Sequence, residues 1–345
     1  PFYFAVEEYV ARKYTNDDYF MAWRVEPTVM LGRNQLIENE VNIDYCKRNN
    51  IHIFRRKSGG GCIYADKGCM QFSYISFAEN VNSAFIEYMK SIAEMIKSLG
   101  INTELSGRND ILVDGKKVAG SAFYRLKGRS VLHNSLLFST QLEHLSQALT
   151  PGKEKLQSKG VASVRQRVTN VGTYTTLNIE AFMAYVRQYM CGNEVLELTP
   201  DDMQQIAEIE KELASDNFIY GKNPKYTEVR KKRFADVGTI QAHIELKNNK
   251  IVNINLMGDY FLSGDLDNEL LNLLHGVDFS REAVANAIEG VEMGNVIRNF
   301  TTEQFLRLLF GRPPHVMKPD WLKINLTSKK SSGETAGILA RHHMN

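Results

Sequence analysis

The groups best suited to chemistry are concentrated in the segment RRKSGGGCIY, residues 55–64. Here a run of cations, residues 55–57, is followed after one serine by consecutive glycines, residues 59–61. Glycine lets backbone amides approach a bound group closely and permits positive φ, and cations beside such a loop compensate an anion. The pattern predicts a site for a bulky anion such as an acyl phosphate or a nucleotide. The alternative is a tight surface turn with a solvated basic edge.

Further polar clusters follow along the chain. They are GRND at 107–110, KKVAGSA at 116–122 and HNSLL at 133–137. The GxxxxGK[ST] loop of P-loop phosphoryl transferases is missing, and no GxGxxG follows a strand. The usual mononucleotide and dinucleotide folds are therefore disfavoured.

In this order, the motifs resemble those of the lipoate–protein ligases. The signatures of that family run RRxSGGGxVYHDxGNxxFS, then GRNDxxVxGxKxSGxA, then HHGTLL. The segments LGRNQ at 31–35, KGVASVR at 159–165 and YGKNPK at 220–225 also look like family segments. The likeness covers roughly residues 1–313, and several ordered motifs over that length make chance agreement a poor explanation.

The resemblance implies a reaction in two steps. Lipoate and ATP, with Mg²⁺, first give lipoyl-adenylate and pyrophosphate, and a lysine of an acceptor domain then attacks the mixed anhydride. The family's acceptors are the lipoyl domains of 2-oxoacid dehydrogenase E2 subunits and the glycine cleavage H protein. Octanoate is a second possible acyl substrate. Neither nucleic acid nor a membrane is expected as a partner.

The resemblance also assigns roles to residues. It makes Lys117 the catalytic residue, which contacts the adenylate and polarises the acyl carbon while AMP leaves; by itself Lys117 would be a solvated lysine at a hairpin edge. Asp110 becomes a candidate Mg²⁺ ligand. Arg56 and the glycine amides would stabilise charge at the α-phosphate, and Ile63 and Tyr64 would line the acyl pocket. The full set implied for ATP or adenylate binding is Arg56, Ser58, Gly59, Gly60, Gly61, Ile63, Tyr64, Asn109, Asp110, Gly120, Ser121, Ala122 and His133.

The chain departs from the family pattern at several positions near these residues. Ala65 stands where a histidine is common, Cys69 replaces an asparagine, and HHGT becomes LHNS at 132–135. The arginine that follows the GSA segment is shifted by one, to Arg125. These changes affect the surroundings of His133 and Arg125 in particular.

Apolar periodicity predicts an α+β fold rather than a doubly wound α/β fold. Strands joined largely by hairpins alternate with helices, and Asp-Gly at 114–115 is a hairpin signal. The expected helices are 1–13, 83–99, 268–275, 281–288 and 302–310; the expected strands are 21–31 (two, with a turn), 51–54, 70–77, 111–113, 118–123, 132–138, 239–246 and 251–256.

These elements predict a catalytic domain over 1–212 and a small accessory domain over 217–313. The tail, 314–345, resembles the N-terminal opening of lipoyl synthase, which suggests a ligase–synthase fusion or a vestige of one; an unrelated basic tail is the alternative. The basic stretch 150–169 is either a solvated loop or a flap that closes over an anionic ligand. Because the chain opens on Pro1, we expect a short N-terminal piece to be missing.

Composition favours a globular protein of the cytoplasm. The chain has 345 residues, 43% of them hydrophobic, and a net charge of +2, so no general attraction to nucleic acid or membrane is expected. No secretory leader or membrane span is visible. Its four cysteines fit neither a zinc site nor a disulfide framework.

Two other functions stay open at this level. Cys62 and Cys69 flank the glycine loop, so a lipoyl or octanoyl transferase that uses a Cys thioester is one. A non-catalytic acyl-binding homologue is the other. Biotin ligase, a relative of similar fold, is disfavoured because its GRGRxG loop is missing.

Overall fold

The structure is a computed structural model, and it describes residues 1–78, 80–107, 109–149, 167–220 and 226–311. Residues up to Gly311 belong to one compact unit. Residues 150–166 of the basic stretch 150–169, expected to be a solvated loop or a flap, and the lipoyl synthase-like tail, 314–345, lie outside the described residues. Within the described part, no helix combines the length and the apolar character that crossing a membrane requires.

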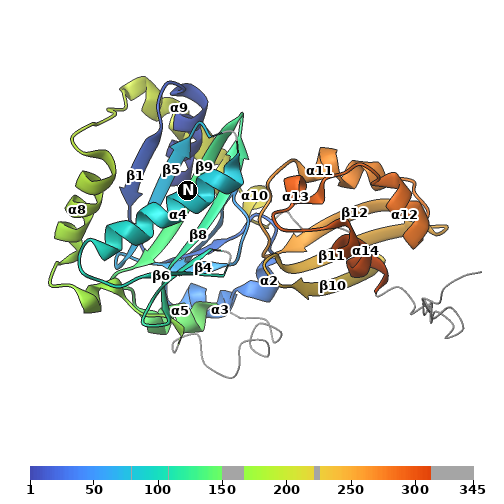
Figure 1. Cartoon of the computed structure of the whole chain (residues 1–345), viewed down its shortest axis with the longest axis horizontal. Coiled ribbons are helices and arrows are strands. Elements are labelled where there is room, and N and C mark those ends of the chain that lie inside the picture. The colour runs from blue at the N-terminus through green and yellow to red at the C-terminus, as the bar shows by residue number, and fades with distance from the viewer. Residues whose placement is uncertain (79, 108, 150–166, 221–225, 312–345) are drawn as a thin grey trace, which may run out of the picture. The chain divides into compact units, whose positions relative to one another are not determined.

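A six-stranded antiparallel sheet forms the centre of the catalytic part (Figure 1). Its order is β1 (Tyr19–Trp23), β5 (Cys69–Ser76), β9 (Arg129–Leu137), β8 (Lys116–Leu126), β7 (Asp110–Val113) and β6 (Glu104–Ser106). The β7–β8 hairpin turns at Asp114 and Gly115, both with positive φ, as the Asp-Gly signal predicted. The sheet and its hairpins confirm the α+β class.

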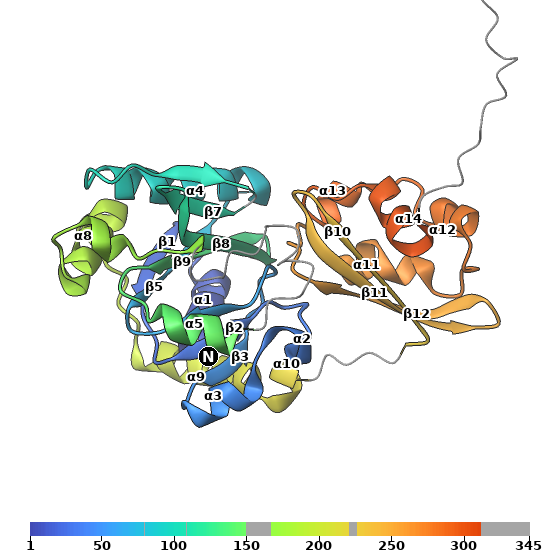
Figure 2. The ribbon, with the colours of Figure 1, turned by 90° about the horizontal axis from the view of Figure 1, so that it is seen from below.

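Helices cover both faces of this sheet (Figures 1 and 2). Helix α4 (Val81–Lys97), expected over 83–99, packs against β8 and β9 and buries apolar residues at three- and four-residue spacing, Phe85, Met89, Ile92 and Ile96. Helix α1 (Phe2–Lys13) packs against β5, β8 and β9 on the other face. The remaining helices of this part are α5 (Leu142–Ala148), the 3-10 turn η1 (Val171–Tyr174), α8 (Ile179–Cys191), α9 (Pro200–Ala214) and α10 (Asp216–Tyr220).

A second, three-stranded sheet carries the glycine loop. Its order is β3 (His52–Arg55), β2 (Thr28–Leu31) and β4 (Ile63–Ala65), in which β2 and β3 are parallel and β2 and β4 antiparallel. The short helices α2 (Ile37–Glu40) and α3 (Ile43–Arg48) connect β2 to β3. The loop therefore leaves β3 and returns as β4, on either side of the same central strand.

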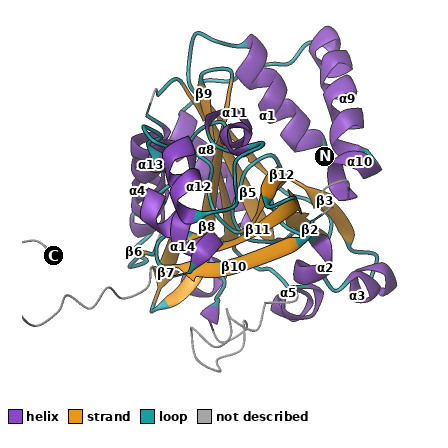
Figure 3. Ribbon diagram, turned by 90° about the vertical axis from the view of Figure 1, so that its right-hand side faces the viewer, coloured by secondary structure: helices purple, strands orange, loops and turns teal. Residues whose placement is uncertain are grey.

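The accessory region is a three-stranded antiparallel sheet with helices packed on it (Figure 3). Its strands are β10 (Glu228–Phe234), β11 (Gly238–Lys247) and β12 (Lys250–Gly258). Its helices are α11 (Leu266–Glu269), η2 (Leu271–Leu274), α12 (Arg281–Ala287), α13 (Met293–Val296) and α14 (Thr302–Phe310), the last of which contacts β10 and β11. A capping box between Thr301 and Gln304 begins α14, which was expected over 302–310.

Two expectations for this region were incomplete. The single helix expected over 268–275 is two short pieces, because the backbone at Leu270 leaves the helical conformation with φ −137° and ψ −60°. Strand β10 and helix α13 were not predicted. The division at 212–217 stays a proposal, and Ile219 packs in the same core as residues of α1 and α9.

Candidate active site

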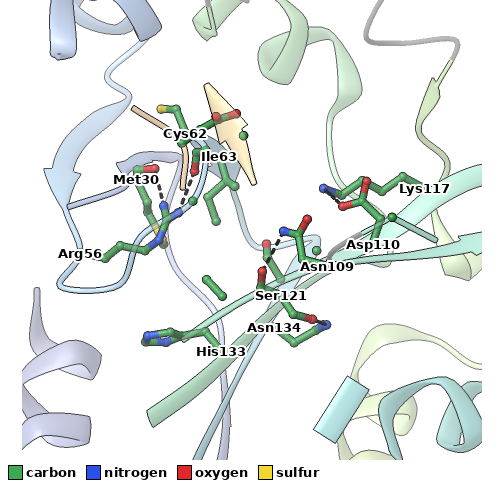
Figure 4. A pocket seen from close by; sticks show the side chains of 18 of the residues that line it. Met30, Arg56, Cys62, Ile63, Asn109, Asp110, Lys117, Ser121, His133 and Asn134 are labelled. Atoms are coloured by element: carbon green, nitrogen blue, oxygen red, sulfur yellow. Dashed lines mark hydrogen bonds and ion pairs between the residues drawn. The ribbon is translucent and has the colours of Figure 1, made fainter. Parts of the chain in front are cut away.

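A cavity of about 440 Å³ gathers residues from the glycine segment 55–64 and from the polar clusters 107–110, 116–122 and 133–137 (Figure 4). The predicted residues that line it are Arg56, Gly60, Gly61, Ile63, Asn109, Asp110, Lys117, Gly120, Ser121, Ala122 and His133. Ser58, Gly59 and Tyr64 were also predicted but are not among its lining residues. Phe4, Trp23, Met30 and Phe72 add apolar surface to its wall.

Strand pairing explains how distant motifs meet. Asp110 on β7 lies opposite Gly120 on β8, and Ala122 on β8 lies opposite His133 on β9. The register between β7 and β8 shifts between Ile111 and Leu112, beside Lys117. A bulge of this kind re-aims a neighbouring side chain, and it places Lys117 on the cavity wall.

Lys117 and Asp110 form an ion pair in the cavity, with 2.7 Å between Nζ and Oδ1. Both side chains are partly exposed, 35% and 25% respectively. Gly120 lies against this lysine, since a Cβ at that position would be 2.7 Å from Nζ. Nζ is the far end of a flexible side chain, so an added methyl group would require only that Lys117 shifts.

Asn109 is fixed to the neighbouring strand by two hydrogen bonds. Its Nδ2 donates to the Ser121 carbonyl at 2.8 Å, and its own carbonyl accepts from the Ser121 amide at 2.9 Å. The Ser121 hydroxyl in turn accepts from Asn134 Nδ2 at 2.9 Å. The arrangement gives this wall a fixed set of polar groups.

Arg56 organises the glycine loop from inside. Its guanidinium donates to the carbonyls of Met30, Gly59 and Gly61 at 3.0, 2.7 and 2.7 Å, and its Nε donates to Ser58 Oγ at 2.9 Å. Burial lowers the pKa of Arg56 to about 10, which leaves it charged at neutral pH. The sequence assigned Arg56 to the phosphate; in the structure these donors are engaged by the loop itself.

Two of the glycines make close contact with the segment that follows β12. The Gly60 amide donates to the Tyr260 carbonyl at 3.0 Å. A Cβ on Gly59 would lie 2.3 Å from that same oxygen, and one on Gly60 would lie 2.7 Å from the ring of Phe261. The sequence predicted that this loop approaches a ligand; Gly59 and Gly60 approach another part of the chain.

Ile63 and Tyr64 do not share the cavity. Successive side chains on a strand point to opposite faces, so only one of these neighbours on β4 can reach it, and that one is Ile63. Tyr64 is 2% exposed and stacks on His144 with 6.2 Å between ring centroids. The expectation that Tyr64 lines the acyl pocket is therefore corrected by strand alternation.

His133 belongs to a buried network that the sequence did not reveal. Its Nδ1 lies 3.0 Å from Oε1 of Glu7, a fully buried carboxylate of α1. The same oxygen accepts from the Ser73 hydroxyl, which accepts from Trp23 Nε1 at 2.9 Å. The sequence did contain one signal for this network: Glu7 is an acidic residue on the apolar face of a helix, a position where a buried carboxylate needs a polar partner.

Arg167, Arg233, Asp236 and Asp259 also line the cavity. They were not predicted as site residues, although Arg167 was noted in the basic stretch. Arg233 lies 4.0 Å from Asp259 and donates to the Thr239 hydroxyl at 3.3 Å. Strand β10, which supplies Arg233, was itself not predicted, so its contribution could not be anticipated.

The cysteines and carboxylates limit the available chemistry. Cys69 is fully buried, and burial raises the pKa of its thiol to about 12, so it is neutral at pH 7. Cys62 is half-buried and lines the cavity. In the described part of the chain, no three His, Cys, Asp or Glu side chains gather closely enough to hold a metal ion. Asp110, the candidate Mg²⁺ ligand, pairs with Lys117 in this structure, and its role toward the metal stays a prediction.

Comparison with protein families confirms the resemblance read from the motifs. The model for the lipoyl protein ligase A/B catalytic domain matches residues 1–191, and the model for the bacterial lipoate protein ligase C-terminus matches residues 223–309. Lipoate-protein ligase LplJ of Bacillus subtilis (strain 168) is 34% identical over 317 residues, which are 89% of this chain and 95% of that protein. Lipoate–protein ligase 1 of Staphylococcus aureus is 34% identical over 296 residues, 81% and 89% of the two chains.

Solved structures agree with the fold. LipL1 of P. falciparum, in complex with lipoate, matches with a TM-score of 0.68 at 22% identity over 88% of this chain and 93% of its own. A bipartite lipoate protein ligase, described together with its E2 lipoyl domain from Thermoplasma acidophilum, matches with 0.57 at 26% identity, over 66% and 94%. A lipoate-protein ligase A bound with ATP matches with 0.56 at 25% identity, over 64% and 93%.

Proposed function

The chain belongs to the family of lipoate–protein ligases, and we propose that it works through lipoyl-adenylate. In the first step, a carboxylate oxygen of lipoate attacks the α-phosphorus of ATP, and pyrophosphate leaves. In the second, the amine of an acceptor lysine attacks the acyl carbon, the bond to AMP breaks, and the nitrogen loses a proton to leave an amide.

The observation that carries this proposal is one cavity with two kinds of wall. Phe4, Trp23, Met30 and Phe72 offer apolar surface, which suits the hydrocarbon chain of lipoate or octanoate. Lys117 stands on the polar part of the same cavity, beside Asn109 and Asp110. An acyl-adenylate has an apolar tail and an anionic head, and it would place its anhydride near Lys117.

Lys117 can stabilise the negative charge that develops on the acyl oxygen and on the leaving phosphate. For this its ammonium exchanges the Asp110 carboxylate for the adenylate. We further propose that Mg²⁺ enters with the phosphates of ATP, which usually provide much of its coordination in such sites. The amide of Asn109, held by Ser121, is available to orient the nucleotide.

The acceptor is proposed by analogy. The archaeal ligase noted above was studied with an E2 lipoyl domain. We propose lipoyl domains of 2-oxoacid dehydrogenase E2 subunits, and the glycine cleavage H protein, as the acceptors of this chain. We propose the cytoplasm as the place of reaction, since ATP is present there and the four cysteines, none of which forms a disulfide in the described residues, would stay reduced.

Lipoate-dependent exchange of pyrophosphate into ATP tests the first step. Wild-type protein should catalyse exchange only with lipoate or octanoate present, and Lys117→Ala should lower the rate by about 10²–10³-fold, the usual cost of removing one charge-stabilising donor. Lys116→Ala is the matched control, because this neighbouring lysine is exposed and does not line the cavity. Absence of exchange by the wild-type protein, or an undiminished rate in Lys117→Ala, contradicts the proposal.

One alternative is favoured by a specific observation. Cys62 lines the cavity, so a transferase that passes the acyl group through a thioester has a candidate nucleophile. Such an enzyme needs no ATP, and Cys62→Ala would abolish its transfer. In a ligase, Cys62→Ala retains pyrophosphate exchange. The buried, neutral Cys69 does not serve this alternative.

A further inference from the structure

Arg167 stands on the wall of the cavity with no partner among the described residues, and we propose that it binds a phosphate of the nucleotide next to Lys117. The inference rests on the proposed use of ATP and adds Arg167 to the residues of the proposed ATP-binding site. Arg167 is half-buried and lines the same cavity as Lys117. Among the described residues, it forms neither a hydrogen bond nor an ion pair.

The other cations of the cavity are already engaged. Lys117 pairs with Asp110 at 2.7 Å. Arg56 donates to the carbonyls and the serine of its own loop. Arg233 lies 4.0 Å from Asp259 and binds the Thr239 hydroxyl. Arg167 is thus the lining cation whose five guanidinium donors are not engaged by any described residue.

The backbone after Arg167 is fixed to the strand that carries Lys117. Val168 forms a parallel bridge with Lys117, and the Thr169 amide donates to the Lys117 carbonyl at 3.0 Å. Asn170 binds both the amide and the carbonyl of Thr140, at 3.0 and 3.1 Å. Arg167 is therefore held beside Lys117 by contacts that do not involve its own side chain.

Charge and shape select the ligand class. A half-buried guanidinium loses part of its hydration, and an anion bound in the cavity would compensate that loss. The planar fork of arginine matches the oxygens of phosphate in a bidentate manner. A triphosphate carries several negative charges, whereas the carboxylate of lipoate carries one. The nucleotide is therefore the ligand that this arrangement fits best.

Direct binding of ATP tests the assignment separately from catalysis. Titration calorimetry of the full chain with ATP and Mg²⁺ should show at least a tenfold weaker Kd for Arg167→Gln, because a hydrogen bond to a charged group is lost. Arg167→Lys keeps the charge without the fork and should fall between the two. Arg187→Gln is the matched control, because Arg187 is exposed on α8 and does not line this cavity.

The outcomes separate this inference from the proposed function. Equal Kd values for wild type and Arg167→Gln, with wild-type unfolding temperatures, overturn the role of Arg167 and leave the ligase proposal intact. A wild-type protein that does not bind ATP overturns both. A loss of ATP affinity in Arg187→Gln as large as that in Arg167→Gln would mean that general surface charge, not this cavity, controls binding, and it also overturns the assignment.

Discussion

The ammonium of Lys117 lies 2.7 Å from the carboxylate of Asp110, inside the cavity that the sequence motifs share. The register shift between β7 and β8 lies beside Lys117 and brings the pair onto one wall. In the absence of a ligand, Asp110 neutralises the lysine and holds its Nζ at the cavity. The carboxylate is therefore a positioning group for the residue proposed to act on the acyl-adenylate.

Asp110→Asn should reduce ligation with little change in stability. The pair is partly exposed, so its removal is expected to change the free energy of unfolding by at most about 1 kcal/mol. Lys117 would lose the partner that holds it, and kcat/KM for ligation should fall by about tenfold, the equivalent of about 1.4 kcal/mol. Steady-state ligation and urea unfolding measure the two effects, with Lys116→Ala as the control. Full activity in Asp110→Asn would show that the lysine needs no such positioning.

Gly59→Ala tests the contact between the glycine loop and the segment after β12. The new Cβ would lie 2.3 Å from the Tyr260 carbonyl oxygen, so backbone must move. Overpacking of this kind costs about 1–3 kcal/mol, measured by urea unfolding. At Gly294 the nearest atom to an added Cβ is 4.0 Å away, so Gly294→Ala should be tolerated. If both variants are as stable as the wild type, the close approach of Tyr260 to Gly59 is not a constraint on the loop.

Local patterns in the sequence predicted much of this architecture. Helices α4 and α14 followed from apolar spacing and from caps, and the β7–β8 hairpin from Asp114 and Gly115. The motifs also indicated which residues gather at the cavity. Contacts between residues far apart in the sequence could not be predicted in this way. The approach of Tyr260 to Gly59 and the position of Arg233 produce no periodic pattern in the local sequence. Strand alternation, applied to Ile63 and Tyr64, would have excluded one of them from the pocket.

Glu7→Ala should destabilise the protein and weaken lipoate binding. Glu7 is fully buried, and its removal leaves the Ser73 hydroxyl and His133 Nδ1 without their acceptor. Leaving a buried polar group without its hydrogen-bond partner costs about 1–3 kcal/mol. Because His133 lines the cavity, the KM for lipoate should rise as well. Glu7→Gln retains an acceptor oxygen and should cost less.

Glu87→Ala is the control for the two Glu7 variants, because the Glu87 side chain is 70% exposed. Removing this side chain should change the free energy of unfolding by no more than about 0.5 kcal/mol. Urea unfolding and steady-state kinetics with varied lipoate distinguish the effects on the fold and on the cavity. A Glu7→Ala variant with wild-type stability and wild-type KM would mean that the network does not support His133.

Asp202→Asn should destabilise the packing of α1 on α9 in a pH-dependent manner. Asp202 accepts from the hydroxyls of Tyr9 and Tyr14 at 2.6 and 2.9 Å and from the Thr199 amide at 2.7 Å, and it pairs with Lys13. The contact with Lys13, followed by that with Tyr9, holds the pKa of Asp202 well below its usual value of 3.8. A carboxyl with a lowered native pKa contributes stability above its unfolded pKa and loses it as the pH falls.

The difference in unfolding free energy between wild type and Asp202→Asn should therefore be constant near neutral pH and shrink as the pH falls below about 4. Urea unfolding at a series of pH values measures it. Asp201→Asn, at the exposed neighbouring position of α9, should show no comparable difference at any pH. A gap that persists unchanged into strong acid would show that Asp202 stabilises the helix pair through its shape and neutral hydrogen bonds rather than through its charge.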